Sequence, residues 1–249
     1  MSLFGNLKSE GLEDSQDRLG GFAPLESGVY DGIIKAMYGG TSSQGATSVT
    51  LIADFGGKEY KETFYVTNKK GENFFFNKDD KTKKVPLPGF TVVDDICLIA
   101  TGEALFQQET EDKVIGIYDY EQKKEIPTTV PMMTALLGQK ISLGILKIIE
   151  NKNEKVGDDY VPTAATRELN NVDKVFHPEL NLTVAEARNG VDTADAKFKD
   201  AWTERNKGVT RDKRTIKDGE AGSAARPTRA AGAAPAAGAT PTKSLFGKK

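Results

Sequence analysis

The sequence predicts a mainly β protein built on a Greek-key barrel, and three observations support this fold class. Apolar side chains occupy every second position of residues 48–55, which is the period of a half-buried strand. Gly56-Gly57 then separates this segment from residues 58–66, and a tight hairpin turn needs positive φ at both of its central positions. A helical spacing of apolar residues follows at 90–100. Antiparallel strands, then a helix, then further strand favour a barrel over a parallel βαβ sheet.

The first part of the chain supplies the predicted strands in order. Residues 29–38 are rich in β-branched and aromatic side chains and form the first strand, and residues 39–46 form a flexible loop. Residues 48–55 and 58–66 form the second and third strands. A turn at residues 68–71 leads into an aromatic run over 72–77.

The second part begins with one helix, predicted over 90–100 and ending near Gly102. We interpret the charged stretch 103–125 as an insertion. The elements expected after it are a short helix over 130–137, a strand over 141–149, a polar loop over 151–159 and a last strand within 160–176. This order fits an OB-fold-like barrel, because the five-stranded OB-fold has a helix between its third and fourth strands.

Composition divides the chain into five parts. We expect an N-terminal arm over 1–21, the OB-like core over 22–188, a charged and partly helical segment over 189–218, a flexible linker over 219–243 and a terminal docking motif over 244–249. The linker consists almost wholly of Ala, Gly, Pro and other small residues, which cannot bury enough apolar surface to order it, so the C-terminal tail is predicted to be disordered.

Two short patterns stand out in these outer parts. Phe198 and Trp202 are four residues apart and can share one face of a docked helix. The sequence Ser-Leu-Phe-Gly occurs at residues 2–5 and again at 244–247. A hydrophobic motif at the end of a flexible linker is suited to docking onto a partner protein, with Leu245 and Phe246 as the contact residues.

The overall charge excludes a broadly basic nucleic-acid-binding protein. The 249 residues include 34 Lys and Arg against 36 Asp and Glu, a formal charge of −2. Any polyanion site must therefore be local. One cysteine and one histidine rule out a disulfide framework, a cysteine-rich zinc site and a histidine pair. We find no apolar run long enough to span a bilayer and no secretory signal, so we expect a reducing cytosolic compartment.

The candidate catalytic patterns are weak, and we expect a protein that is not an enzyme and needs no cofactor or metal. Residues 40–47 have the glycine spacing of a phosphate-binding loop but place Ala46 where lysine is required. Cys97 and His177 have no catalytic partner in the sequence and are interpreted as structural. One alternative stays open: Asp54, Glu59 and Lys61 resemble the residues of a Mg²⁺-dependent nuclease.

The most informative stretch is 58–84, which contains eight lysines, five acids and six aromatic residues and so has a local charge of +3. Aromatic rings can stack on unpaired bases while lysines follow the phosphates, so this composition favours single-stranded DNA as the ligand. Alternation places Tyr60, Phe64 and Val66 on the inward face of the third strand. It also predicts that at least one of the three consecutive rings of 74–76 faces outward. The candidate DNA-binding residues are Lys58, Lys61, Tyr65, Lys69, Lys70, Phe74, Phe75, Lys78 and, from the polar loop, Lys152.

The segment 62–73, with the Lys/Pro/Gly run that follows it to Gly89, resembles the single-stranded DNA-binding proteins of short-tailed bacteriophages. The similarity extends over most of residues 1–187. It implies an OB-fold that coats and protects single-stranded DNA during phage DNA replication, recombination and repair, in the cytoplasm of the infected bacterial host. Carried over by position, the resemblance places six residues on the DNA path: Lys61, Tyr65, Lys69, Lys70, Phe75 and Lys78.

The resemblance also implies partners, with one departure from the family pattern. Such proteins commonly end in an acidic tail, whereas Glu220 is the only acid from Gly219 onward. Autoinhibition by the tail is therefore in doubt. Leu245 and Phe246 are expected to dock onto phage or host replication and recombination proteins, such as a DNA polymerase, a sliding clamp or a helicase. Self-association and a purely protein-binding role for the SLFG termini stay open as alternatives.

Overall fold

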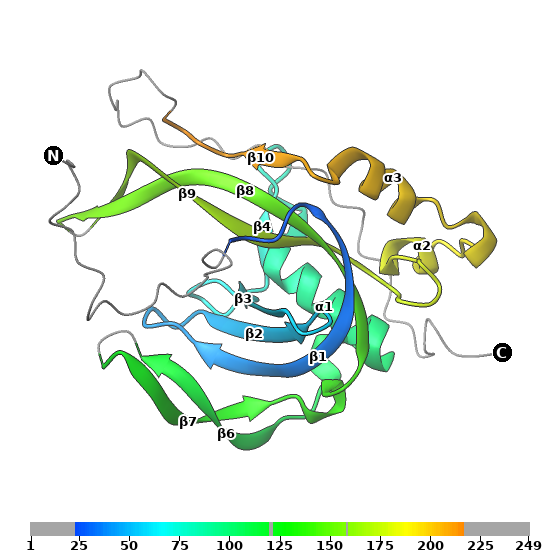
Figure 1. The fold of residues 1–249 in the computed structure, drawn as a ribbon, viewed down its shortest axis with the longest axis horizontal. Coiled ribbons are helices and arrows are strands. Elements are labelled where there is room, and N and C mark those ends of the chain that lie inside the picture. The colour runs from blue at the N-terminus through cyan, green and yellow to red at the C-terminus, as the bar shows by residue number, and fades with distance from the viewer. Residues whose placement is uncertain (1–22, 120–121, 158, 217–249) are drawn as a thin grey trace, which may run out of the picture.

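The computed structural model describes residues 23–119, 122–157 and 159–216. The predicted N-terminal arm, the linker, the SLFG motif with Leu245 and Phe246, and the disorder predicted for the tail lie outside these residues. The fold is mainly β with short helices, as predicted (Figure 1). The main sheet contains β1 (Gly28–Thr41), β2 (Thr47–Asp54), β3 (Glu59–Tyr65), β6 (Glu111–Asp119), β7 (Lys124–Met132), β8 (Lys140–Val156), β9 (Asp159–Phe176) and β10 (Thr210–Asp212).

The remaining elements are short. A separate two-stranded sheet pairs β4 (Phe74–Phe76) with β5 (Lys84–Pro86). The helices are α1 (Pro88–Thr101), α2 (Val184–Arg188) and α3 (Phe198–Asn206), and 3₁₀ turns occur at η1 (Leu105–Gln107), η2 (Thr134–Leu136) and η3 (Thr193–Asp195). No helix of the described residues is long and apolar enough to cross a membrane.

The strand order places β3, β2, β1, β8 and β9 side by side, with every neighbouring pair antiparallel. The chain passes through α1 between β3 and β8, which is the position of the helix expected for an OB-like barrel. Gly56 and Gly57 both have positive φ, of 67° and 96°, in the β2–β3 turn. The predicted hairpin is therefore confirmed.

α1 fills the centre of the curved sheet. Its buried residues Val93, Ile96, Cys97, Leu98 and Ile99 join a core with the inward side chains of β1, β2, β3, β8 and β9. Burial, with a contribution from Asp94, raises the pKa of the Cys97 thiol to about 12, so this cysteine is a core residue. The Nδ1 atom of His177 accepts hydrogen bonds from the backbone N–H groups of Glu179 and Leu180 and orders the turn after β9.

The edges of β3 and β9 meet without a hydrogen-bonded ladder between them. The Glu62 carboxylate joins them instead, because its Oε2 accepts the backbone N–H of Val172 at 2.8 Å and its Oε1 accepts the side-chain amide of Asn171 at 3.2 Å. The hydroxyl of Tyr60 donates to the same carboxylate. One side chain on β3 thus closes the barrel against β9.

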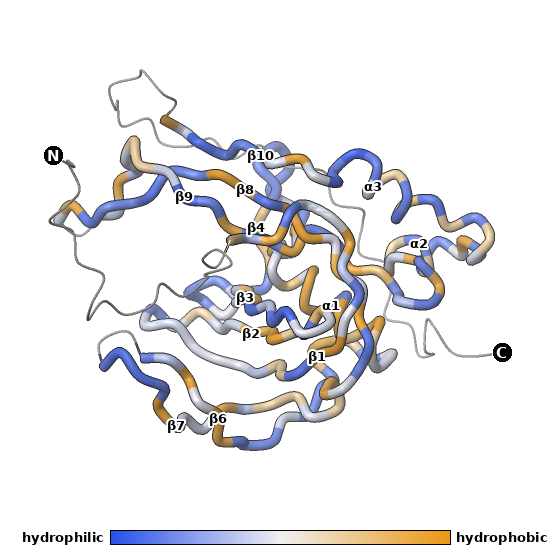
Figure 2. The backbone as a smooth tube through the Cα atoms, in the orientation of Figure 1, coloured by the Kyte–Doolittle hydropathy of each residue, from blue (hydrophilic) through white to orange (hydrophobic). Residues whose placement is uncertain are grey.

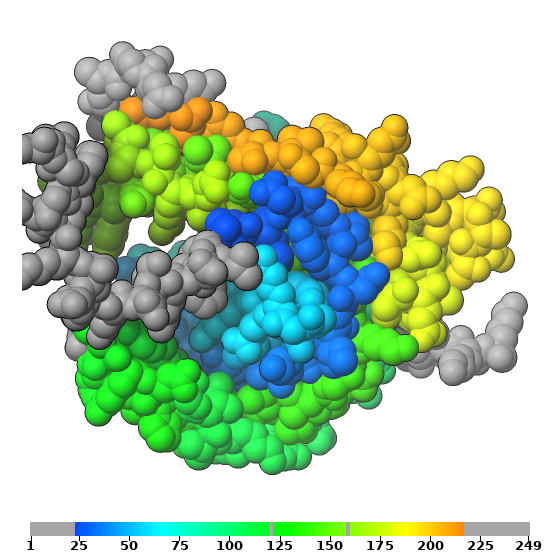
Figure 3. Space-filling model, viewed as in Figure 1, coloured from blue at the N-terminus to red at the C-terminus, as the bar shows by residue number. Residues whose placement is uncertain are grey.

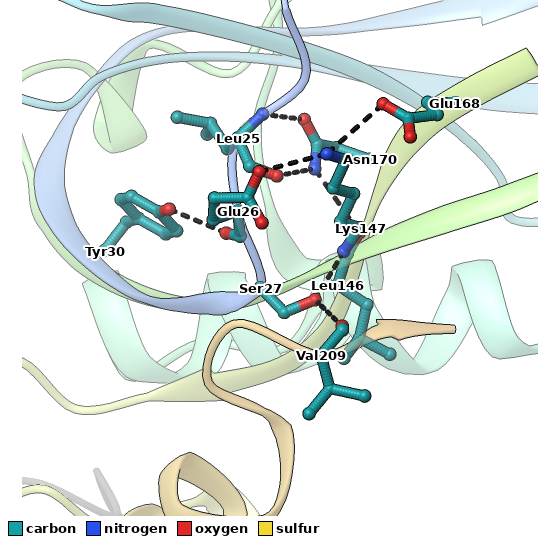
Figure 4. A network of polar contacts seen from close by, with 9 residues as sticks. All are labelled: Leu25, Glu26, Ser27, Tyr30, Leu146, Lys147, Glu168, Asn170 and Val209. Carbon is teal, nitrogen blue, oxygen red and sulfur yellow. Dashed lines mark hydrogen bonds and ion pairs between the residues drawn. The ribbon is translucent and has the colours of Figure 1, made fainter. Parts of the chain in front are cut away.

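The entry segment before β1 crosses β8 and β9 (Figure 4). The side chain of Asn170 accepts the backbone N–H of Leu25 at 2.7 Å and donates to its carbonyl at 2.8 Å, as a neighbouring strand would. The Lys147 ammonium lies 3.0 Å from Glu26 and 3.2 Å from Glu168. These contacts fix the start of β1 to the β8–β9 hairpin.

Ser27 is buried within this network and connects three segments. Its hydroxyl donates to the carbonyl of Val209 at 2.6 Å and accepts the backbone N–H of Lys147 at 2.7 Å (Figure 4). Val209 directly precedes β10, which pairs in parallel with β8. The entry segment, β8 and the C-terminal segment are therefore held together at one residue.

One prediction about the second half of the chain is wrong at the hairpin β6–β7. The charged stretch 103–125, interpreted as an insertion, contains η1 and β6, and β6 pairs with β7. The short helix predicted over 130–137 is a strand up to Met132 followed by the turn η2. This hairpin packs Val130 and Met132 onto Ala36 and Tyr38 of β1 in a second small core. It forms the lower margin of the molecule in Figure 3.

The polar loop predicted over 151–159 is also wrong. β8 continues to Val156 and β9 starts at Asp159, so this segment is the end of a long hairpin. The hairpin projects beyond the rest of the sheet, and its polar residues are exposed (Figures 1 and 2). Because no face of it is buried, the period of two that identifies a strand is missing. The last strand predicted within 160–176 is confirmed as β9.

The C-terminal segment docks on the outer face of β8 and β9. Phe198 and Trp202 share one face of α3, as predicted, and both rings contact Phe176. A Cβ atom on Gly144 would lie 3.1 Å from the Trp202 ring, so the helix packs closely on a position of β8 that has no side chain. A side chain at Gly144 would push against the indole, so glycine allows this close approach.

Asp95 makes the folded state sensitive to pH. Burial and then the charge of Asp94 raise its pKa from 3.8 to about 7, against the opposing charges of Arg188 and Lys174. A carboxyl group with a raised pKa binds more protons when folded, so stability falls as pH rises from about 4 to about 7. We expect Asp95→Asn to remove part of this decrease and to raise the unfolding free energy at pH 8.

Urea denaturation of both proteins from pH 4.5 to 8 measures the effect. The matched control is Asp79→Asn, which changes an exposed carboxylate in the β4–β5 turn and should leave the pH profile unchanged. Parallel pH profiles for the wild-type protein and Asp95→Asn would contradict the assignment.

Candidate nucleic-acid interface

The outward face of β3 is open to solvent. The β6–β7 hairpin covers the outward face of β1, and Ile52 of β2 packs beneath it. Along β3 the side chains of Lys61, Thr63 and Tyr65 are exposed, and Tyr65 retains 55% of its surface. Tyr60 and Phe64, which alternate with them, are buried. The alternation predicted from the sequence is therefore confirmed, and it leaves lysine and aromatic side chains on the open face.

Tyr65 also lines a groove that runs along the junction of β3, β9 and α1. The groove has a volume of about 410 Å³. Its lining residues come from β3 and the following turn, the start of α1, and β9: Glu62, Thr63, Phe64, Tyr65, Thr67, Asn68, Leu87, Pro88, Gly89, Val92, Asn171 and Val172. The groove lies where the barrel is closed by a side chain rather than by a strand ladder.

Glu62 is the acidic side chain among the residues that line this groove. Burial raises the pKa of its carboxyl, and the hydrogen bonds from Tyr60, Val172 and Asn171, with the charge of Lys213, act in the opposite direction. Burial and the adjacent carboxylate likewise raise the pKa of Tyr60, so this phenol stays protonated and serves as a donor. The three hydrogen-bond partners of Glu62, namely Tyr60, Asn171 and Val172, are all donors, which suits a carboxylate that holds two chain segments together.

The start of α1 packs directly on the backbone of Tyr65. A Cβ atom on Gly89 would lie 2.4 Å from the Tyr65 carbonyl oxygen and 3.1 Å from its nitrogen. Any side chain at this position would push the helix away from β3, and glycine allows the contact. Gly89 therefore sets the width of the groove beside the Tyr65 ring.

A tight turn presents the two lysines that follow β3. The Asn68 side chain accepts the backbone N–H groups of Lys70 and Glu72 and donates to the Glu72 carboxylate, and Gly71 adopts a positive φ of 79°. Lys69 and Lys70 are exposed at the tip of this turn. The turn is ordered by its own side chains, and its two lysines directly follow Thr67 and Asn68, which line the groove.

The β4–β5 hairpin carries the aromatic run. Phe75 retains 39% of its surface and Phe76 48%, which confirms that at least one ring faces outward. Phe74 packs edge-on against Phe76 and lies under the Lys84 ammonium at 4.2 Å from its centroid. The hairpin is joined to the start of α1 because Leu87 donates to the carbonyl of Asn73.

The predicted residues separate into one group and two outliers. Lys61, Tyr65, Lys69, Lys70, Phe74, Phe75 and Lys78 follow one another along β3, its turn and the β4–β5 hairpin, and of these only Tyr65 lines the groove. Lys58 lies in the β2–β3 turn, at the opposite end of β3 from Tyr65. Lys152 is exposed on the projecting part of β8, outside the lining of the groove.

Both carboxylates of the nuclease alternative are engaged in structural contacts, whereas its third residue, Lys61, is exposed. Asp54 and Glu59 are cross-strand partners, as the hairpin requires. The Asp54 carboxylate accepts the backbone N–H of Gly57 in the turn, and Glu59 lies 3.9 Å from the Lys35 ammonium. Within the described residues, no group of three or more His, Cys, Asp or Glu side chains is placed to hold a metal ion.

Sequence reasoning did not select three residues that shape the site, namely Glu62, Asn68 and Gly89. One signal was available for Glu62. The alternation that buries Tyr60 and Phe64 also turns Glu62 inward, and a carboxylate on the inward face of a strand needs specific donors. Nothing local marks Gly89, because the backbone that it approaches belongs to another element. No protein-family model matches this chain, and no curated protein sequence matches it either.

Glu62 can be tested as the side chain that closes the barrel. We expect Glu62→Ala to lower the free energy of unfolding by about 2–4 kcal/mol, because it leaves the N–H of Val172 and the hydroxyl of Tyr60 without their acceptor. Glu62→Gln keeps an oxygen acceptor of the same shape and should lose much less. Urea denaturation at pH 7 measures both variants. Equal stability of Glu62→Ala and the wild-type protein would show that the junction is held elsewhere.

Proposed function

We propose that this protein binds single-stranded DNA along β3, the turn after it and the β4–β5 hairpin, without catalysis. The observation that carries the proposal is the exposure of aromatic rings among lysines on one continuous stretch. Tyr65, Phe75 and Phe76 remain exposed although large aromatic side chains are normally buried. Exposed rings of this kind offer stacking faces to unpaired bases.

The charge of the same stretch supports a phosphate backbone as the companion contact. Residues 58–84 carry +3 although the whole chain carries −2. The cations of this stretch are all lysines, which act as point charges and favour contact with phosphates over bidentate reading of base edges. Weak sequence selectivity is the expected consequence.

The resemblance of segment 62–73 to phage proteins supports a biological setting for this binding. In that setting the protein coats and protects single-stranded DNA during phage DNA replication, recombination and repair. The C-terminal Leu245 and Phe246 would recruit replication or recombination proteins. The setting and the recruiting role are both part of the proposal, and Leu245 and Phe246 lie outside the residues that the structure describes.

Titration of fluorescently labelled oligo-dT, followed by anisotropy over a series of salt concentrations, tests the proposal. We expect the logarithm of the binding constant to fall linearly with the logarithm of the salt concentration. The slope should steepen by about 0.7 for each phosphate that the protein contacts. A duplex of the same length should bind much more weakly, because its bases are paired and stacked. Equal affinity for the duplex and the single strand would overturn the proposal.

Tyr65→Ala separates stacking from charge. Because one stacked base contributes roughly 1–3 kcal/mol, we expect affinity for oligo-dT to fall between about 5-fold and more than 100-fold, with the salt slope unchanged. The matched control is Tyr118→Ala. Tyr118 is similarly exposed on β6, on the opposite face of the hairpin from Ile115 and Ile117, which pack toward the sheet. If both variants bind as the wild-type protein does, the DNA lies on another surface.

A further inference from the structure

We propose that a second pocket, formed by α3, β9 and the start of β10, binds one nucleotide of the same DNA strand. Arg205 and Arg211 would contact its phosphate, and Phe198 would lie under its base. This inference rests on the proposed function and adds a second contact site to it. None of these three residues belongs to the lysine–aromatic stretch of residues 58–84.

The pocket lies on the outer side of β9 and has a volume of about 300 Å³. This volume is at the lower end of the range for ligand pockets, as expected for a ligand of one nucleotide. Its lining is formed by Asp173, Phe198, Ala201, Trp202, Arg205, Asn206 and Arg211. Two guanidinium groups and an aromatic ring therefore face one small space.

One of the two arginines is held in place by buried polar contacts. The Asn206 amide is buried, and its oxygen accepts a hydrogen bond from Arg211 at 3.3 Å while its nitrogen donates to the Trp202 carbonyl at 2.7 Å. Asp173 accepts the indole N–H of Trp202 at 2.7 Å and lies 4.0 Å from Arg211. Arg211 is thus oriented before any ligand arrives.

The other arginine is available for a ligand. Among the described residues, no carboxylate lies within 4.0 Å of the Arg205 guanidinium, although Arg205 lines the pocket. A planar guanidinium matches two oxygens of a phosphate, and two arginines facing one space form an anion site of higher specificity than lysines do. The phosphate oxygens of DNA supply such a ligand.

Phe198 provides the aromatic surface of this pocket. Phe198 retains 41% of its surface although its ring contacts Phe176 on one side. The Lys174 ammonium lies 5.9 Å from the ring centroid and adds a third cation beside the pocket. An aromatic ring next to arginines favours a nucleotide over an acidic peptide, which would need the cations but not the ring.

The pocket and the groove are lined by neighbouring residues of the same strand, β9. Asn171 and Val172 line the groove, whereas the next residue, Asp173, lines the pocket. Asp173 is the extra residue of a bulge, because Val172 pairs with Ile145 and Lys174 pairs with Gly144. Among the described strands β9 pairs only with β8, so its other edge, which faces β3, carries no strand ladder. A DNA strand that leaves the groove can therefore cross this edge of β9 and reach the pocket.

The only tryptophan of the chain, Trp202, lines this pocket and reports on its occupancy. We expect oligo-dT of about 16 nucleotides, the upper end of OB-fold site sizes, to change Trp202 fluorescence in step with its binding measured by anisotropy. If the oligonucleotide binds by anisotropy and Trp202 fluorescence stays constant, the inference fails while the proposed function stands. If it does not bind at all, both fail.

Arg205→Ala tests the phosphate contact without disturbing a structural pair. We expect severalfold weaker binding of oligo-dT and a salt slope that is smaller by about 0.7, the value for one lost phosphate contact. Lys207→Ala is the matched control, because it removes one positive charge just after α3 and outside the pocket lining. If the two variants weaken binding equally, the loss reflects only the removal of one positive charge, and the proposed phosphate contact of Arg205 is wrong.

A polyglutamate peptide serves as the competing probe. If polyglutamate changes Trp202 fluorescence and oligo-dT does not, the pocket takes an acidic protein segment and the nucleotide assignment is wrong. If oligo-dT changes the signal and polyglutamate does not, the assignment is supported, because charge alone does not fill the site.

Discussion

The contact between the Glu62 carboxylate and β9 is the constraint on which the barrel depends. Among the described strands β3 pairs only with β2 and β9 only with β8, and the Glu62 carboxylate of β3 joins their edges by accepting two hydrogen bonds from β9. It also accepts one from Tyr60 of its own strand. A carboxylate can accept several hydrogen bonds at once, so one side chain is enough to join the two strands where no backbone ladder forms. The junction leaves a groove beside α1, and Gly89 lets that helix approach closely enough to form its wall. The position of Tyr65 follows from both contacts.

The same architecture decides which side chains remain for binding. The β6–β7 hairpin covers the outward face of β1 with a second apolar core, so β3 alone presents Lys61 and Tyr65 to solvent. The turn ordered by Asn68 and the β4–β5 hairpin follow β3 along the chain and add further lysines and exposed rings. The negative charge of the whole chain is compatible with this surface because charge acts locally, over about 8–10 Å at ordinary salt concentrations.

The C-terminal segment extends the sheet and adds a different chemistry. β1 pairs with β8 as far as Ile145, and β10 pairs with the next part of β8, from Lys147 to Ile149. Ser27 connects β8 to the segment before β10 through its hydrogen bonds with Lys147 and Val209. α3 brings Arg205 into the pocket that Asp173 of β9 also lines, whereas Asn171 and Val172 of the same strand line the groove beside Tyr65. In the arrangement that we propose, lysines provide affinity that depends little on geometry, and the arginine pocket fixes one nucleotide in place.

The sequence by itself determined the parts of this protein that depend on local periodicity. Alternation identified β2 and β3 and the inward and outward faces of β3, two glycines identified their hairpin, and helical spacing identified α1. Local patterns succeed there because each strand has one buried face. They failed at the projecting part of β8 and β9, whose polar residues have no buried face, and at β6, where only Ile115 and Ile117 pack toward the sheet. Glu62 and its acceptor role toward Val172, 110 residues away, and the pairing of Asp173 with Trp202 and Arg211 were decided only by the tertiary structure. Contacts between residues so distant in the chain produce no periodic pattern in the sequence, because the residues around each partner do not depend on where the other partner lies in the chain.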